Sequence, residues 1–197
     1  MQIKLLFLLV VLTGSVLITS AQEAKREQSA KKGCSCSFSS INQLGGLYGS
    51  KGTYFQLQTI NGIRYKTWFA GIGVGADYYF RKGFPVFLDI RKDIFEKRST
   101  PFLYADAGIH LVQKRKEKES QWYENTYSNG FYGDAGIGYK LGLGTTSGLL
   151  VSAGYSYKNV NRRYESMIGC GTSRCYENYF TYSNYLHRFS LKLGLQF

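Results

Sequence analysis

Apolar and polar positions alternate with a period of two along much of the chain, and the alternation is sharpest over residues 185–197. One face of this segment is almost wholly aromatic or aliphatic and carries Tyr185, His187, Phe189, Leu191, Leu193, Leu195 and Phe197. The other face is mostly polar and carries Leu186, Arg188, Ser190, Lys192, Gly194 and Gln196. Such alternation predicts a β-strand with one apolar face. A tilted strand of roughly 9–11 residues crosses a bilayer, and this strand is long enough to do so.

The same alternation recurs upstream of the last strand. Six further segments show it, beginning near Thr53, Trp68, Phe84, Pro101, Gly130 and Gly148. A weaker first strand around Ile41 to Ser50 brings the set to about eight, which is the smallest common size of a membrane barrel. One face of nearly every strand is apolar, whereas the other carries glycine, serine and charged side chains.

Connection lengths distinguish a membrane barrel from a soluble β-sandwich, which would show the same alternation. Counted from a first strand that leaves the periplasm, the even-numbered connections are short: Tyr65–Thr67, Lys97–Thr100 and Gly144–Ser147. The two long connections, Gln113–Asn129 and Asn161–Asn184, both fall at odd junctions. Short periplasmic turns and long external loops are typical of outer-membrane barrels. The sequence therefore predicts an all-β fold, an eight-stranded antiparallel up-and-down transmembrane β-barrel over residues 41–197.

The polar face of this predicted barrel carries charges of both signs. A narrow barrel of about eight strands fills its interior with side chains, and an unpaired buried charge is costly. We therefore expect an ion-pair network in the lumen, with inward glycines making room for the long side chains. Its expected members are Asp77, Asp89, Arg91, Asp106, Asp134, Lys140, Arg188 and Lys192, together with Arg64 and Lys158.

The N-terminal residues have the pattern of an export signal. Lys4 precedes an apolar run over residues 5–18, and the small residues 19–21 suit cleavage after Ala21. The run is too short for a confident spanning helix, so an uncleaved anchor is the weaker alternative. We expect a signal peptide over residues 1–21, a flexible N-terminal segment over 22–40, and a location in the outer membrane of a Gram-negative cell, reached through the periplasm.

The four cysteines agree with export into an oxidising compartment. Cys170 and Cys175 flank the short segment Gly-Thr-Ser-Arg, which predicts a small disulfide loop. Cys34 and Cys36 form a C-x-C pair that could bridge each other, bind a metal ion or do neither. Two ligands do not fill a tetrahedral zinc shell, so no metal site is predicted.

The amino-acid composition favours β-strands, and the net charge bears on which molecules the protein binds. The chain has 17 Tyr, 13 Phe and 23 Gly against 2 Pro, and Tyr and Phe favour strands. Its formal net charge of +12 at first suggests nucleic acid, but the Lys and Arg residues are spread along the chain. The expected partners are therefore outer-membrane lipid and lipopolysaccharide, with no nucleic acid.

Candidate catalytic chemistry is sparse. The run Gly71-x-Gly73-x-Gly75 lacks the G-x-G-x-x-G spacing of a nucleotide site. His110 shares a strand face with Asp106, and a His–Asp pair can serve a serine nucleophile, but no motif places a serine beside it. A polar lumen residue is the better interpretation of His110, and we expect His187 to face lipid. No catalytic, metal or cofactor site is predicted.

Four segments resemble the small outer-membrane β-barrel domain family, which is similar to OmpA-type and opacity-type barrels. They are Phe55–Tyr65, Gly71–Tyr79, Pro85–Arg91 and Thr100–Gly108. The closing strand also resembles the C-terminal signal read by the barrel-assembly machinery, which implies that machinery as a partner during biogenesis. Its residues would be Phe189, Leu191, Leu193, Leu195 and Phe197.

These observations predict a non-enzymatic outer-membrane protein, expected to be monomeric, with a structural or surface-interaction role. The two long external loops would carry the interaction, because loops on a rigid scaffold commonly carry binding functions. Two alternatives from other classes remain, namely a lipid-modifying outer-membrane enzyme and a small porin-like pore.

Overall fold

The computed structural model of the chain describes residues 36–50, 52–79, 82–112, 117–120, 123–143, 147–167 and 177–197. The predicted signal peptide over residues 1–21 and the predicted disulfide between Cys170 and Cys175 lie outside these ranges. The described residues form ten strands: β1 Cys36–Gly49, β2 Gly52–Tyr65, β3 Trp68–Asp77, β4 Gly83–Asp93, β5 Thr100–Val112, β6 Glu117–Ser120, β7 Tyr123–Ser128, β8 Gly130–Leu143, β9 Ser147–Met167 and β10 Glu177–Gln196. No helix in the described part of the chain is long and apolar enough to cross a bilayer.

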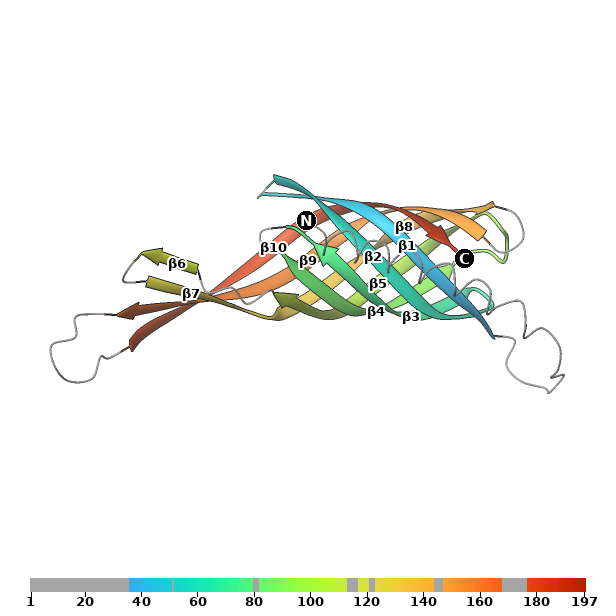
Figure 1. Ribbon diagram of the computed structural model, residues 1–197. Coiled ribbons are helices and arrows are strands. Elements are labelled where there is room, and N and C mark those ends of the chain that lie inside the picture. The colour runs from blue at the N-terminus through green and yellow to red at the C-terminus, as the bar shows by residue number, and fades with distance from the viewer. Residues whose placement is uncertain are drawn as a thin grey trace, which may run out of the picture. The chain divides into compact units, whose positions relative to one another are not determined.

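Eight of these strands close into an antiparallel barrel. Each pairs with its neighbour in the order β1, β2, β3, β4, β5, β8, β9, β10, and β10 pairs back with β1 (Figure 1). At the closure, Leu44 of β1 lies opposite Leu57 of β2 on one side and Leu193 of β10 on the other. The predicted eight-stranded antiparallel barrel is therefore confirmed.

One end of the barrel, called here the turn end, carries short connections. Lys66 and Thr67 join β2 to β3, and Lys66 adopts a positive φ of 52°. Residues 94–99 join β4 to β5, and β10 ends beside them at the same end. The turns predicted at Tyr65–Thr67 and before Thr100 are found there. Of the turn predicted at Gly144–Ser147, only Ser147 is described, as the first residue of β9.

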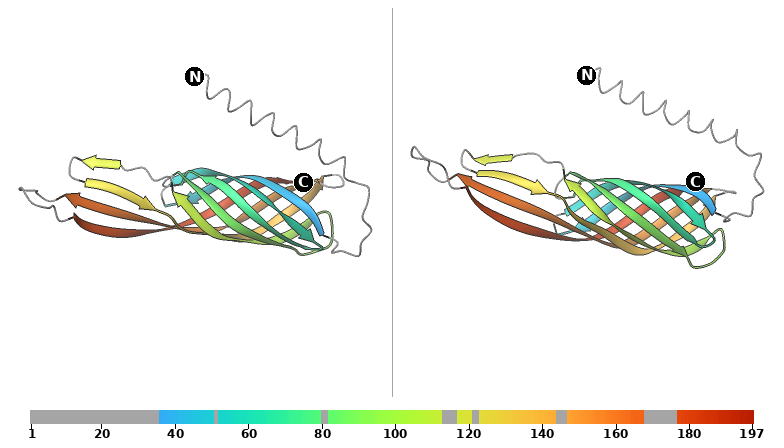
Figure 2. Two further views of the ribbon diagram at one scale, coloured as in Figure 1. Left: turned by 60° about the horizontal axis from the view of Figure 1, so that its bottom comes forward. Right: turned by 90° about the horizontal axis from the view of Figure 1, so that it is seen from below.

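At the opposite end the same sheet continues beyond the barrel in a part called here the extension. It consists of β6, β7, residues 161–167 of β9 and residues 177–183 of β10. Figure 2 shows these strands running on beyond the barrel wall. The connections predicted as long loops, Gln113–Asn129 and Asn161–Asn184, are thus largely strand in their described parts, and this corrects the sequence prediction.

The first strand begins earlier than the sequence predicts. The flexible segment was expected to reach residue 40, yet β1 starts at Cys36. The amide N–H of Ser40 donates to the main-chain oxygen of Phe197 (3.0 Å), and the N–H of Phe197 donates to the oxygen of Ser40 (2.9 Å). Residues 36–40 therefore belong to the barrel. Cys36 is disulfide-bonded, which answers part of the question left open for the C-x-C pair.

Burial alternates along the barrel strands, with the polar residues inside. Among the fully enclosed side chains are Asp89, Lys158 and Arg188, whereas Ile72, Leu88 and Ile137 are each more than three-fifths exposed. The sequence alternation therefore assigned the faces of the strands correctly. Two groups of buried apolar side chains also occupy the lumen. The first contains Ile41, Ile60, Phe69, Phe87, Phe102, Tyr104, Tyr132 and Leu150, and the second contains Leu47, Tyr79, Val112, Tyr127, Val160 and Leu186.

Candidate functional site

The charged side chains of the lumen gather in three clusters along the barrel. The extension-end cluster is built on Asp77, whose Oδ2 accepts hydrogen bonds from Lys158 Nζ (2.9 Å) and Arg188 Nη1 (2.8 Å). Lys158 also donates to the main-chain oxygen of Tyr79, and Arg188 Nη2 donates to Ser156 Oγ, both at 2.9 Å. All three charged side chains are at most 1% exposed. One buried carboxylate thus pairs with two buried cations.

The middle cluster is built on three aspartates of neighbouring strands. Asp89, Asp106 and Asp134 occupy one register level, because Asp106 lies opposite both of the others. Arg91 donates hydrogen bonds to the Asp89 carboxylate from Nε (3.0 Å to each oxygen) and from Nη2 (2.8 Å). Lys192 Nζ lies 3.0 Å from Asp134 and 3.5 Å from Asp106. Three carboxylates therefore share two cations, so carboxylates are in excess here, whereas cations are in excess in the extension-end cluster.

The turn-end cluster is built on Asp93. Its carboxylate accepts a hydrogen bond from Arg64 Nη1 (2.7 Å) and pairs with Lys140 Nζ. The sequence prediction included Arg64 and Lys140 but missed Asp93. The signal was available, because Asp93 continues the two-residue spacing of Asp89 and Arg91 on the inward face of β4.

All eight predicted network residues lie in the lumen, and the structure divides them among these clusters. Asp77 and Arg188 belong to the first, Lys140 to the third, and the remaining five to the second. A polar relay adds further cross-lumen contacts. Gln43 Nε2 donates to Gln58 Oε1 (2.5 Å), and Gln58 Nε2 donates to the Tyr132 hydroxyl (2.8 Å).

Inward glycines face aromatic rings more often than charges. A Cβ added at Gly73 would lie 2.4 Å from the ring of Phe87, and one at Gly138 would lie 2.4 Å from Phe102. The expectation that these glycines make room for charged side chains describes Gly45, which faces Lys192. At Gly73 and Gly138 the space instead holds aromatic rings.

The two histidines lie on opposite faces. His110 is fully buried in the lumen, and neither ring nitrogen has a hydrogen-bond partner among the described residues. Asp106 makes no hydrogen bond to it either, so the geometry contains no His–Asp pair. His187 is exposed on the outer wall, where its Nδ1 lies 2.5 Å from the Tyr155 hydroxyl.

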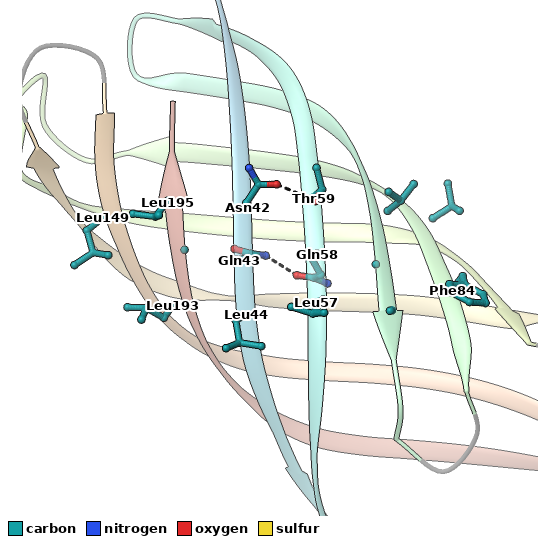
Figure 3. A pocket seen from close by; sticks show the side chains of 15 residues that line it. Asn42, Gln43, Leu44, Leu57, Gln58, Thr59, Phe84, Leu149, Leu193 and Leu195 are labelled. Atoms are coloured by element: carbon teal, nitrogen blue, oxygen red, sulfur yellow. Dashed lines mark hydrogen bonds between the residues drawn. The ribbon is translucent and has the colours of Figure 1, made fainter. Parts of the chain in front are cut away.

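The outer wall is apolar over its middle and aromatic towards both ends. Tyr65, Trp68 and Phe95 are exposed at the turn end, and Tyr155, Tyr185 and Phe189 are exposed towards the extension. A groove of about 810 Å³ crosses this wall over β1 and β2. Figure 3 shows Leu44, Leu57 and Leu193 along it, with Thr59 Oγ1 donating to Asn42 Oδ1 (2.9 Å). Such a surface can be covered by lipid chains.

The extension carries its described side chains in cross-strand rows. Tyr127 of β7, Arg162 of β9 and Tyr182 of β10 lie opposite one another. The Arg162 guanidinium lies 5.8 Å from the centre of the Tyr127 ring. Phe180 and Tyr182 are about three-fifths exposed. This sheet is therefore a platform of aromatic and cationic groups joined to a rigid barrel.

The predicted assembly-signal residues all point outward from β10. Phe189, Leu191, Leu193, Leu195 and Phe197 are 67%, 64%, 54%, 43% and 55% exposed. Together they form a continuous apolar row on the outer face of β10. The recognition itself stays a prediction.

Comparison with known proteins gives a match in structure but not in sequence. No protein family matches the sequence, and no curated protein matches it. The solved structure of Neisserial surface protein A, an eight-stranded outer-membrane β-barrel, superposes with a TM-score of 0.53 at 13% sequence identity. The superposition covers 82% of this chain and 97% of that chain. At this identity the similarity shows a shared fold, namely that of a small outer-membrane barrel.

Proposed function

We propose that the chain is a non-enzymatic barrel of the bacterial outer membrane that presents the extension as an interaction surface. The observation that carries this proposal is the inverted polarity of the barrel, with ion pairs buried inside and an apolar wall outside. Water would favour the opposite arrangement. A closed barrel leaves no unpaired strand edge in lipid, which supports the same conclusion.

The two ends of the barrel support an orientation in that membrane. Outer-membrane barrels have short periplasmic turns and longer elements outside the cell. The turn end would accordingly face the periplasm, and the extension would stand at the cell surface. The structural neighbour is named a surface protein, which agrees with this orientation.

Lipid and lipopolysaccharide are the proposed partners of the wall, and a second macromolecule is the proposed partner of the extension. The wall offers exposed leucines and isoleucines together with the groove of about 810 Å³. The extension offers Phe180, Tyr182 and Arg162, whose residue types are enriched where proteins bind one another. OmpA-type or opacity-type membership and monomeric state belong to the same proposal.

Fractionation with gel mobility tests the location. The mature chain should be found in the outer-membrane fraction and should migrate differently before and after boiling, because an unboiled closed barrel stays folded in the gel. Recovery from the soluble periplasm without a heat-dependent shift would contradict the proposal.

Epitope tags test the orientation. A tag placed between β6 and β7 should be labelled by antibody on intact cells. A matched tag between Lys66 and Thr67 should be labelled only after the outer membrane is permeabilised. The reverse result would place the extension in the periplasm.

A further inference from the structure

The turn end of the barrel contains a polar pocket that the proposed surface role does not use. Its volume is about 300 Å³, and three cationic side chains line it, those of Arg64, Arg98 and Lys140. Ser39, Ser147 and Gln196 contribute hydroxyl and amide groups to the same lining. None of the described residues that line the pocket has a carboxylate side chain.

Positive charge is in excess around this pocket. Asp93 is the ion-pair partner of both Arg64 and Lys140, and Arg98 has no ion-pair partner among the described residues. Three cations against one carboxylate leave two positive charges. A terminal carboxylate at Phe197 would offset one of these charges and leave the other.

Arg98 lies in a segment that packs against β8. A Cβ added at Gly142 would lie 2.9 Å from the Cβ of Arg98, so the two segments are already in close contact. The amide N–H of Gly142 donates to Ser99 Oγ (3.3 Å), which links the same segment to β8. The side chain of Arg98 is exposed, and its guanidinium is therefore available to a ligand in the pocket.

One flank of the pocket is apolar. Phe38 and Phe197 line it and are 65% and 55% exposed on the outer wall. A ligand that fits both parts has an anionic group for the cations and an apolar portion that can lie along these rings. Arginine and lysine together bind phosphate oxygens through charge-assisted hydrogen bonds.

We propose that this pocket binds the phosphate group of an anionic phospholipid. Only the leaflet involved, the periplasmic one, rests on the proposed function, because it requires the turn end to face the periplasm. Binding by the purified barrel does not depend on that orientation, so failure of the orientation test and failure of this proposal are distinguishable.

Calorimetric titration tests the proposal with the refolded full chain in zwitterionic detergent. The probe is a short-chain phosphatidylglycerol, and the matched neutral-headgroup lipid is short-chain phosphatidylcholine. We expect saturable binding of the first and clearly weaker binding of the second, because its choline cation offsets the charge of the phosphate. Arg98→Gln should weaken binding roughly tenfold or more, as expected for the loss of one charge-assisted hydrogen bond.

Lys97→Gln is the matched control. Lys97 is exposed, carries the same charge, neighbours Arg98 in the chain and does not line the pocket. Both variants must first show the heat-dependent gel shift of the folded barrel. Equal weakening by the two variants, or no saturable binding by the unaltered chain, would overturn the proposal. If inorganic phosphate displaced the lipid at a similar concentration, the ligand would be free phosphate rather than a phospholipid, and this result would also overturn the proposal.

Discussion

At the scale of single residues, Asp77 is the side chain whose loss would leave the most buried charge without an ion-pair partner. Asp77→Asn would leave Lys158 and Arg188 buried together without a carboxylate. Removing one partner from a buried ion pair typically costs about 3–5 kcal/mol, and we expect a loss of this size in the free energy of unfolding. Urea titration of the barrel refolded in lipid vesicles measures it.

Asp93→Asn is the matched control for that loss. It also removes a carboxylate that pairs with two cations. However, the Arg64 side chain is 22% exposed, so solvent can hydrate it once the carboxylate is gone. The destabilisation should be clearly smaller than that of Asp77→Asn. Equal losses in the free energy of unfolding would show that burial does not determine how much these clusters contribute to stability.

Gly138 gives a second prediction at this scale. In Gly138→Ala the new methyl group would meet the ring of Phe102 at 2.4 Å, and overpacking of a filled interior costs roughly 1–3 kcal/mol. Gly46→Ala is the control, because nothing lies within 4 Å of the added carbon. Thermal unfolding followed by gel mobility should separate the two variants, and the double variant Gly138→Ala/Phe102→Leu should recover part of the loss.

The residue scale also shows what alternation can and cannot predict. A period of two assigned Asp77, Lys158 and Arg188 to the inward face correctly. It could not predict that these three meet, because their contact depends on the register of β3, β9 and β10 around the closed barrel. It also could not predict that Phe87 and Phe102 fill the space beside Gly73 and Gly138, because the face of a strand does not tell which side chains come together.

At the scale of elements, the alternation of apolar and polar residues predicted the strands of the barrel and missed the strands of the extension. Residues 161–167 and 177–183 form strands of the extension beyond the barrel wall, so no apolar alternation marks them as buried. The start of β1 at Cys36 was missed for a different reason, since Ser40 on the outward face is polar and the buried Ile41 on the inward face is apolar, which reverses the alternation of the other strands.

The extension should be separable from the barrel. Arg163 and Thr181 lie opposite each other in the ladder of β9 and β10, so an Asn-Gly turn in place of residues 164–180 would join strands that already pair. We expect the shortened chain to keep its heat-dependent gel shift, because the pairing of β9 with β10 continues from there to Gln196.

Binding distinguishes this shortened chain from the unaltered one. Cells that carry it should lose adhesion or ligand binding that depends on the extension, while the amount of protein in the outer membrane stays the same. A shortened chain that no longer folds would show that β9 and β10 need their outer halves to form the barrel.

At the scale of the whole molecule, the clusters at the two ends of the lumen carry an excess of positive charge, and the cluster between them carries an excess of negative charge. Two cations meet one carboxylate at each end, and three carboxylates meet two cations between them. Rings and glutamines occupy the remaining space, including Phe87, Phe102 and Tyr132. Permeating ions of either sign would have to displace these groups, and the pore alternative therefore loses support.

Planar bilayers test this conclusion. The purified barrel should give no steady single-channel conductance at moderate voltage, whereas a true porin added as a positive control should. Reproducible channels of one size would show that the lumen opens in the membrane.

The contacts between distant segments have a consequence for the order of assembly. Arg188 and Asp77 are 111 positions apart, and β10 brings both Arg188 and Lys192 to the lumen. Until β10 arrives, Asp89, Asp106 and Asp134 have Arg91 as their one ion-pair partner among the described residues. A chain stalled one strand short would hold uncompensated carboxylates where lipid could reach them. The last of these strands to be synthesised therefore supplies the cation that pairs with Asp106 and Asp134, and we expect a copy that lacks it to accumulate poorly in the membrane.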